Sequence, residues 1–133
     1  MRFLCVYKPS QEEGGRPSPE HVAEMGKLID TMVKAGALLS TEGCQPSSKG
    51  ARVRLRNGQV SVTDGPFTET KELIGGFAIL QAKSKEEAIE LTKRFLAVAG
   101  DGETEIRQLY EPSDFADEST AGSTPSEATA TPS

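Results

Sequence analysis

Two segments with the same strand–helix–strand order constrain the fold of this chain more than any other feature. In the first unit, β-forming runs at residues 2–8 and 37–44 flank a stretch of helical periodicity. In the second unit, runs at residues 75–83 and 104–111 flank a helical stretch over residues 84–100. Two such units that share one sheet form an α+β, ferredoxin-like layer, in which a mainly antiparallel sheet carries its helices on one face.

Both helices have sequence signals at their ends. Ser18 is placed to cap the first helix, and Ser84 with Glu87 three residues later forms a capping box for the second. Gly36 and Gly100 end the two helices. The predicted buried face of the first helix consists of Val22, Met25, Ile29, Met32 and Val33.

A β-hairpin separates the two units. Asn57 and Gly58 are the preferred pair of a two-residue type I′ turn, and alternating apolar and polar residues lie on both sides of them. This turn places Leu55 opposite Val60, so that apolar residues face apolar residues along one side of the hairpin. The turn chemistry and the hydrophobic pattern therefore predict the same register.

Composition excludes several classes of function. The chain has 133 residues, of which 35% are hydrophobic, and this is enough for one modest core. Four of its 20 acidic residues, Asp114, Asp117, Glu118 and Glu127, lie beyond Pro112, so the rest of the chain carries 16 acidic against 15 basic residues. A nearly neutral body with 5% aromatic residues and no Trp argues against direct binding to nucleic acid.

The two ends of the chain differ sharply in composition. The first run, MRFLCVYK, has a strand pattern without a long apolar segment or a cleavage site, so we expect neither a signal peptide nor a membrane span, and a cytoplasmic protein. The last residues are mostly Ser, Thr, Ala, Pro, Gly and acids, which bury too little apolar surface to order a chain. The sequence predicts one domain over residues 1–115 and a flexible tail over residues 116–133.

The residues that usually hold metals and cofactors are scarce. With one His and two Cys, the chain offers no zinc ligand set at the usual spacings. Cys5 and Cys44 are predicted to be reduced, buried and small hydrophobic residues rather than a disulfide. Neither a phosphate-binding loop nor a dinucleotide-binding pattern is present. We therefore expect no metal and no cofactor.

The apolar pattern of the strands also indicates a partner. Residues 2–8 and 75–83 are apolar at both odd and even positions. Helices cover only one face of a ferredoxin-like sheet, so the apolar side chains of the other face need a different cover. We expect a second copy of the chain to supply it, which makes the protein a homodimer.

One motif resembles a known family. The stretch DGPFTETKE, from Asp64 to Glu72, with LIGGF after it and EGCQPSSKGARVRL before it, resembles the signature of the DGPF family within the YCII-related proteins. The resemblance runs from Met1 to about Phe115. It implies a dimeric α+β barrel, in which two ferredoxin-like halves pack sheet to sheet around a cleft between the subunits. Most members have no assigned activity, many lie beside genes for extracytoplasmic-function sigma factors, and a few relatives in the wider superfamily are small-molecule enzymes.

The connection that follows the hairpin carries the first candidate site residues. Asp64, Glu69 and Lys71 are candidate catalytic residues and Glu72 is a candidate ligand contact, because loops held by a rigid scaffold are where sites commonly form. Two interpretations of Asp64 stay open, a catalytic role and a structural one, since Asp, Gly and Pro in succession also make a turn. The charged residues equally suit a solvated loop with an exposed ion pair.

Four further positions complete the candidate site. A His at the start of the first helix and an acid after a Gly-Pro pair are thought to form a catalytic dyad in YCII-related proteins, and the resemblance carries these roles to His21 and Glu69. The alternative is an exposed His without a role. Arg52 and Arg54 alternate on one strand face, as in an anion site or in a solvated edge. Gly76 marks either a bulge or a place where a ligand comes close.

These residues support functions of different classes. The first is binding of a small molecule in a cleft at a homodimer interface, with cofactor-independent acid/base chemistry such as elimination or hydrolysis. The second is a non-catalytic sensor or accessory protein linked to sigma-factor-dependent transcription. In a third, purely structural interpretation, the motif only shapes the rim of the barrel. The sequence alone does not decide whether the chain is an enzyme.

Overall fold

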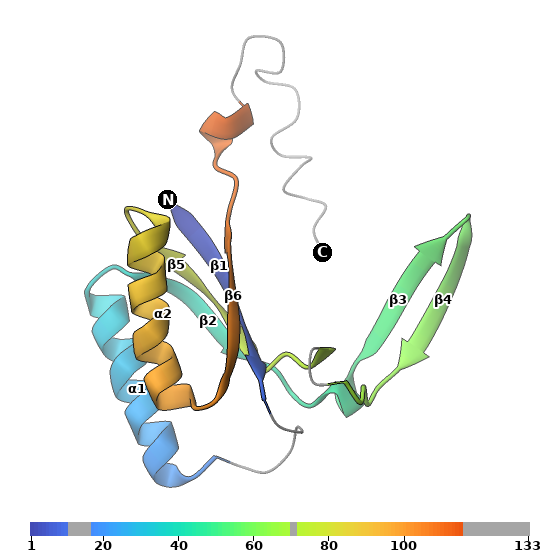
Figure 1. The fold of residues 1–133 in the computed structure, drawn as a ribbon, viewed down its shortest axis with the longest axis horizontal. Helices are drawn as coiled ribbons and strands as arrows, with labels where there is room; N and C mark the ends of the chain where they lie inside the picture. Colours follow the sequence, from blue (N-terminus) through green and yellow to red (C-terminus); the bar gives the residue numbers. More distant parts are fainter. Residues whose placement is uncertain (11–16, 70–71, 116–133) are drawn as a thin grey trace.

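The computed structural model describes residues 1–10, 17–69 and 72–115, so the predicted tail lies outside the described residues. Four strands form one sheet in the order β2-β5-β1-β6, and every neighbouring pair is antiparallel. Figure 1 shows both helices on one face of this sheet. The elements are β1 (Arg2–Pro9), α1 (Pro19–Lys34), β2 (Leu38–Gly43), β5 (Gly76–Gln81), α2 (Lys85–Ala99) and β6 (Gly102–Gln108). This order is the α+β, ferredoxin-like topology that the sequence predicts.

The helix caps form as predicted. The backbone N–H of His21 donates to Ser18 Oγ at 3.1 Å, and the backbone N–H of Glu87 donates to Ser84 Oγ at the same distance. The Glu87 side chain reaches back past the cap and accepts the backbone N–H of Lys83, one residue before Ser84, at 2.7 Å. These bonds satisfy donors that a helix leaves free in its first turn, so local sequence places both helix starts.

The core lies between the central strands and the helices. Phe3 of β1 and Leu80 of β5 are cross-strand partners, with 1% and 3% of their surfaces exposed. Met32 of α1 and Ala88 of α2 cover them from the helix layer. The first half of β1 and the second half of β5 are therefore the most tightly packed part of the sheet.

The buried face of α1 is rotated from the predicted one. Met32 is buried and Met25 is half-buried, but Val22 and Val33 are 55% and 53% exposed. At about 100° per residue, Leu28 lies on the same side as Met25 and Met32, whereas Val22 and Val33 lie at the margin of the arc. The prediction was wrong for both valines because it left out Leu28, which packs against the core. Without Leu28, the centre of the predicted buried face lay too close to Val22 and Val33.

The hairpin has the predicted register and stands apart from the sheet. Its strands are β3 (Ala51–Arg56) and β4 (Gln59–Asp64), which pair only with each other. Leu55 lies opposite Val60, and Asn57 and Gly58 have φ of 52° and 80°, as a type I′ turn requires. In Figure 1 the hairpin projects on the side of the sheet that carries no helix.

The other face of the sheet is apolar and carries no helix, which confirms the predicted pattern. Side chains alternate between faces along a strand, so the neighbours of buried Phe3 and Cys5 point away from the helices. We call this surface the open sheet face, and its apolar residues are the paired Leu4 and Ile79, and Val6 and Phe77. It is bordered on β6 by Glu105, which accepts from Lys8 at 3.1 Å and from Arg107 at 2.6 Å.

The cysteines differ in their surroundings. Cys5 is free and buried, as predicted. Cys44 is free but exposed, which corrects the prediction, because it follows the end of edge strand β2 where the chain leaves the sheet toward the hairpin. No helix within the described ranges is long and apolar enough to cross a membrane.

Candidate functional site

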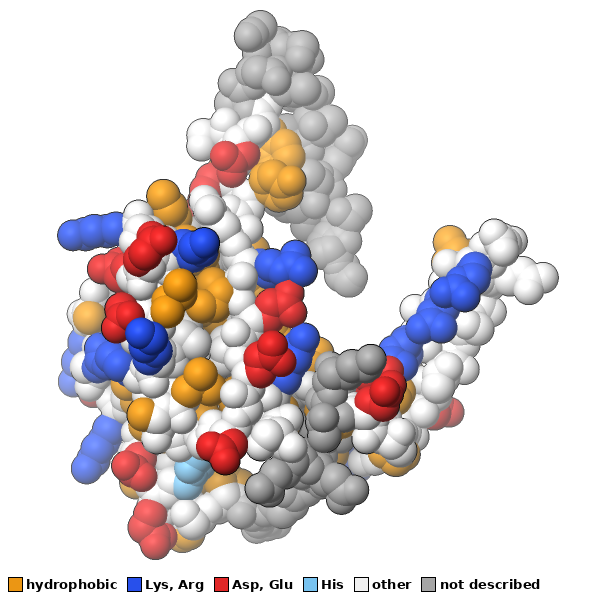
Figure 2. Space-filling model, in the orientation of Figure 1, with side chains coloured by type: hydrophobic (Ala, Val, Ile, Leu, Met, Phe, Trp, Pro, Cys, Tyr) orange, Lys and Arg blue, Asp and Glu red, His pale blue; other side chains and the backbone are white. Residues whose placement is uncertain are grey.

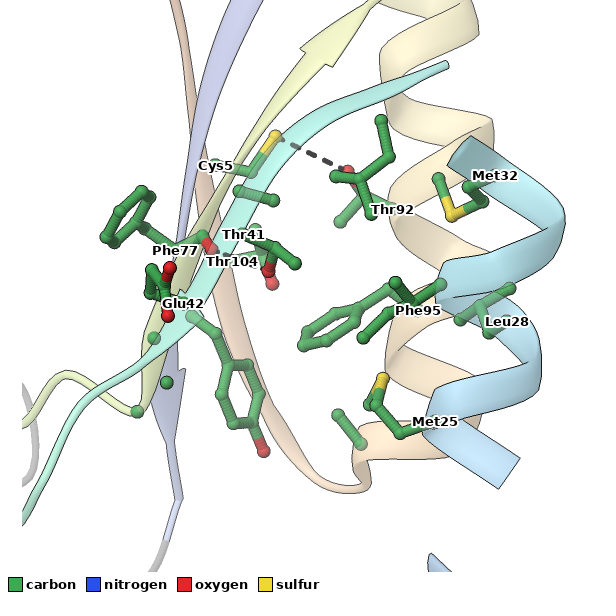
Figure 3. Close-up of a pocket in the computed structure, with 18 of the residues that line it drawn as sticks. Cys5, Met25, Leu28, Met32, Thr41, Glu42, Phe77, Thr92, Phe95 and Thr104 are labelled. Carbon is green, nitrogen blue, oxygen red and sulfur yellow. Dashed lines mark hydrogen bonds between the residues drawn. The ribbon is translucent and has the colours of Figure 1, made fainter. Parts of the chain in front are cut away.

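A pocket opens between α1, α2 and the helix-covered face of the sheet. It has a volume of about 610 Å³, which is within the usual range for a small-molecule site. Most of its lining is apolar, and Figure 3 shows Met25 and Leu28 of α1 and Phe95 of α2 around it. We call it the helix–sheet pocket. Residues of α1 from His21 to Met32 line one side of it.

Tyr7 forms one wall of the pocket. Its ring packs edge-on against Phe95, with the centroids 5.3 Å apart. Its hydroxyl donates to the backbone carbonyl of Asp101 at 3.0 Å. Burial and then the charge of Asp101 raise the pKa of the Tyr7 hydroxyl above its usual value of 10.0. Tyr7 therefore stays neutral, and its hydroxyl hydrogen is already donated to a backbone carbonyl.

Cys5 and Thr92 lie side by side deeper in the pocket, as Figure 3 shows. The Cys5 Sγ is 4.0 Å from Thr92 Oγ1, and the Thr92 hydroxyl donates to the Ala88 carbonyl at 2.8 Å. Burial raises the pKa of the Cys5 thiol above its usual value of 9.0, although the hydrogen bond with Thr92 lowers it in part. A neutral buried thiol is a poor nucleophile, so Cys5 serves as a wall of the pocket.

Thr104 supplies an unusual polar group. It is the cross-strand partner of Tyr7 and therefore lies on the same, helix-covered face of the sheet, where it lines the pocket. Its Oγ1 is buried and has no hydrogen-bond partner in the described part of the chain. A buried hydroxyl without a partner costs about 1–3 kcal/mol, and such a group usually marks a place where water or a ligand binds.

His21 is the candidate catalytic residue that the structure brings to the pocket. It lies in the first turn of α1, is half-buried, and belongs to the lining residues. Gly76, a predicted ligand contact, also lines the pocket. A Cβ on Gly76 would lie 2.7 Å from the backbone carbonyl oxygen of Glu42, so the pairing of β5 with β2 already requires glycine there.

The DGPF motif forms a junction at the base of the hairpin. The backbone N–H of Gly65 donates to the Gly50 carbonyl at 3.0 Å, and the backbone N–H of Phe67 donates to Ser47 Oγ at 2.9 Å. A Cβ on Gly65 would lie 1.7 Å from the backbone oxygen of Ser47, so no larger residue fits without moving the backbone. The peptide bond from Gly65 to Pro66 is cis. Gly65 therefore has a structural role at this turn, because only a residue without a side chain fits beside the Ser47 carbonyl.

The charged residues of the motif gather at this junction rather than in the pocket. Arg52 lies over the Phe67 ring, 4.2 Å from its centroid, and pairs with Glu72 at 3.5 Å. The carbonyl of Glu69 accepts the backbone N–H of Glu72 at 2.9 Å. Asp64 ends β4 with an exposed side chain. These four positions are absent from the lining of the helix–sheet pocket.

The remaining predicted site residues lie elsewhere. Arg54 is exposed on β3 opposite Ser61. Lys71 lies outside the described residues. The structure therefore separates the predicted dyad, because His21 lines the pocket and Glu69 does not. Among the described residues, no group of three or more His, Cys, Asp and Glu side chains is placed to hold a metal ion.

Sequence reasoning missed Tyr7, Phe95 and Thr104 as site residues. Tyr7 and Phe95 follow the apolar patterns of their strand and helix, and these patterns predict only core. Thr104 carries a usable signal, because a hydroxyl at an inward position of a strand needs a partner. That signal becomes visible only when the register between β1 and β6 is known.

Comparison with known proteins gives the following relatives. The profile of the YCII-related domain matches residues 1–112. An uncharacterised protein of Rhizobium meliloti (strain 1021) is 34% identical over 109 residues, which covers 80% of this chain and 85% of the relative. A solved 5-chloro-2-hydroxyhydroquinone dehydrochlorinase from Burkholderia phenoliruptrix, in complex with 2,5-dihydroxybenzoquinone, is 18% identical with a TM-score of 0.47, and the match covers 84% of this chain and 95% of that one.

The junction geometry predicts a position-specific effect of added methyl groups. Gly65→Ala should lower the free energy of unfolding by about 1–3 kcal/mol, because its Cβ meets backbone that cannot easily move. Gly50→Ala is the matched control, since its Cβ would lie 3.7 Å from Ser47 at a φ of −128° that any residue adopts. Circular dichroism during urea unfolding and amide exchange of β3 and β4 measure both effects. Equal stability of the two variants would contradict the structural role of Gly65.

Proposed function

This chain belongs to the YCII-related family, and on that premise we propose that it binds a small, uncharged and largely apolar molecule in the helix–sheet pocket. The observation that carries the proposal is the pocket itself, a volume of about 610 Å³ lined mainly by apolar side chains. Pockets of this size and composition are typical of small-molecule sites, whereas a close-packed interior leaves few voids larger than a water molecule.

The polar groups of the pocket support a neutral ligand with one hydrogen-bonding group. Thr104 Oγ1 is buried without a partner, so a ligand oxygen or nitrogen nearby would gain a hydrogen bond and remove an unfavourable burial. Tyr7 and Cys5 are both kept neutral because burial raises their pKa values. A ligand charge buried beside these groups would have no counter-charge, which is costly in an apolar site.

We further propose that His21 acts as the acid or base in cofactor-independent chemistry, such as an elimination or a hydrolysis. His21 is the one candidate catalytic residue among the described positions that lines the pocket. Imidazole is the side chain best suited to proton transfer near neutral pH. Catalytic roles for Asp64, Glu69 and Lys71 stay predictions of the sequence, as do the cytoplasmic location and any link to sigma factors.

The open sheet face supports a homodimer. Leu4, Val6, Phe77 and Ile79 form a continuous apolar surface across the two central strands, and no helix of the subunit covers it. A surface of this kind usually marks an interface. A second copy can cover it symmetrically, because each subunit presents the same patch to the other. A cleft between the subunits stays a prediction, whereas the helix–sheet pocket lies within one subunit.

Occupation of the pocket should protect one cysteine and leave the other unchanged. N-phenyl-1-naphthylamine is an uncharged apolar probe, and its binding should slow the alkylation of Cys5, which lines the pocket. Cys44 is exposed and outside the pocket, so it is an internal control. Without the probe, Cys5 should react more slowly than Cys44 at pH 7.5 because Cys5 is buried, and its rate should rise with pH because burial raises the pKa of its thiol and only the thiolate reacts. Mass spectrometry after brief exposure to N-ethylmaleimide measures both rates. Equal Cys5 rates with and without saturating probe would contradict the proposed site.

Removal of the imidazole should abolish chemistry without abolishing binding. In a screen of small uncharged compounds followed by mass spectrometry, we expect His21→Ala to lower turnover by about 10²–10⁴-fold, as the loss of a general acid or base does. Its affinity for N-phenyl-1-naphthylamine should change less than about twofold, since the apolar lining is intact. Lys27→Ala, on the same helix but exposed and outside the pocket lining, is the control and should keep its turnover. Unchanged turnover in His21→Ala would contradict the catalytic role of His21. If the wild type binds compounds but turns none of them over, the proposed chemistry is wrong and the proposed binding stands.

A charge on the open sheet face should separate the subunits. Ile79→Glu places a carboxylate in the middle of the proposed interface, where its burial without a partner costs several kcal/mol. Sedimentation velocity at micromolar concentration should show a dimer for the wild type and a monomer for this variant. Val33→Glu is the control, because Val33 is an apolar residue that is 53% exposed on the helix layer, and it should stay dimeric. A monomeric wild type would contradict the homodimer.

A further inference from the structure

The β3–β4 hairpin carries an apolar face that the described residues of its own chain do not cover. Its strands pair only with each other. The apolar residues of this face are between 62% and 70% exposed, and they are Val53, Leu55, Val60 and Val62. A two-stranded hairpin is marginally stable at best in water, so an apolar hairpin face of this size indicates that another molecule covers it.

Within the described ranges, the contacts that attach the hairpin to the body lie at its base. The contacts there are the hydrogen bonds of Gly65 and Phe67 and the stacking of Arg52 on the Phe67 ring. Figure 2 shows the outer part of the hairpin separated from the body by open space, with a row of basic side chains along it. These basic residues, Arg52, Arg54 and Arg56, lie on the face opposite the valines and Leu55. The two faces therefore differ, one solvated and one apolar.

The direction of the hairpin indicates what covers it. It projects on the side of the open sheet face and away from the helices (Figure 1). Its strands have six residues each, a length of about 20 Å, whereas two sheets that pack face to face lie only about 10 Å apart. A second copy stacked on the open sheet face is thus within reach of the hairpin of the first.

We propose that the β3–β4 hairpin is an arm that packs its apolar face, Val53, Leu55, Val60 and Val62, on a second copy of this chain. Two-fold symmetry makes the contact reciprocal, so that each subunit holds the other with its arm. The arginine face stays in water, which agrees with its charge. The body of the chain is nearly neutral, with 16 acidic and 15 basic residues before Asp114, so net charge does not oppose association.

This inference rests on the proposed homodimer and is independent of the ligand. An acidic or nucleic-acid partner would contact the arginine face and leave the apolar face in water, so it would not remove the exposure that requires an explanation. A second copy covers the apolar face of the hairpin and the open sheet face together. The arm also extends the interface beyond the four apolar residues of the sheet.

Removal of the apolar face should weaken the dimer. Leu55→Ser combined with Val60→Ser truncates a cross-strand pair whose members are 70% and 65% exposed, so the core of the subunit is left intact. We expect the dissociation constant of the dimer to rise roughly tenfold or more, because two buried aliphatic side chains are lost from the interface. Arg54→Ser is the matched control on the opposite face of the same strand, and its dissociation constant should change less than about twofold. Sedimentation at a series of concentrations measures all three proteins.

Amide exchange tests the contact directly. The β3 and β4 amides of the wild type should be protected above the dissociation constant and exchange rapidly below it, and circular dichroism should show the same fold for every variant. If the Leu55→Ser, Val60→Ser double variant dimerises as tightly as the wild type, the proposed arm contact is wrong while the homodimer stands. The same holds if Arg54→Ser weakens the dimer as much as the double variant does. A monomeric wild type would overturn both proposals and leave a different partner for the hairpin.

Discussion

Strand β1 lies at the centre of the sheet and carries apolar side chains on both of its faces, and this constraint shapes the rest of the molecule. On one face, Phe3 and Cys5 need the two helices as cover, and the helices supply it. On the other face, Leu4 and Val6 point away from the helices and lie between strands β5 and β6. The hydrophobic effect acts on both faces, and the helices cover the apolar side chains of only one of them (Figure 1).

The same strand accounts for the pocket. Phe3 and Cys5 are packed under the helices, and the next inward residue of the strand, Tyr7, lines the pocket. Its ring is held by Phe95 and its hydroxyl by the backbone at Asp101, so it does not collapse into the space beside it. The Tyr7 ring on one side and helix α1 on the other therefore border a volume that side chains do not fill.

Local sequence predicted the elements well because the signals for them are local. Ser18, Ser84 and the Asn57-Gly58 pair act within four residues, and each forms the predicted bonds or backbone angles. The face of α1 was predicted less well, since helical periodicity does not say where on a wide apolar arc the sheet will lie.

The candidate site was predictable only in part for a related reason. His21 and Gly76 line the pocket, but the pocket depends on how closely a helix approaches a sheet, which no spacing in the sequence encodes. The residues of the motif were grouped by their closeness in sequence, and in the fold that closeness builds a junction at the hairpin base. Thr104 lies far from all of them in sequence and faces the same space as His21 only through the pairing of β1 with β6.

The position of the DGPF motif suggests why a motif of this kind can matter without touching a substrate. Gly65 approaches the backbone of Ser47 so closely that the direction in which the hairpin leaves the body is determined there. Arg52 then links the first hairpin strand to Phe67 and Glu72 on the chain that returns to the sheet. A small change of angle at this base moves the tip of an arm about 20 Å long by several ångströms. If the arm packs on a second subunit, the motif controls the fit between subunits, and the glycine at position 65 follows from backbone geometry at the junction rather than from chemistry in the pocket.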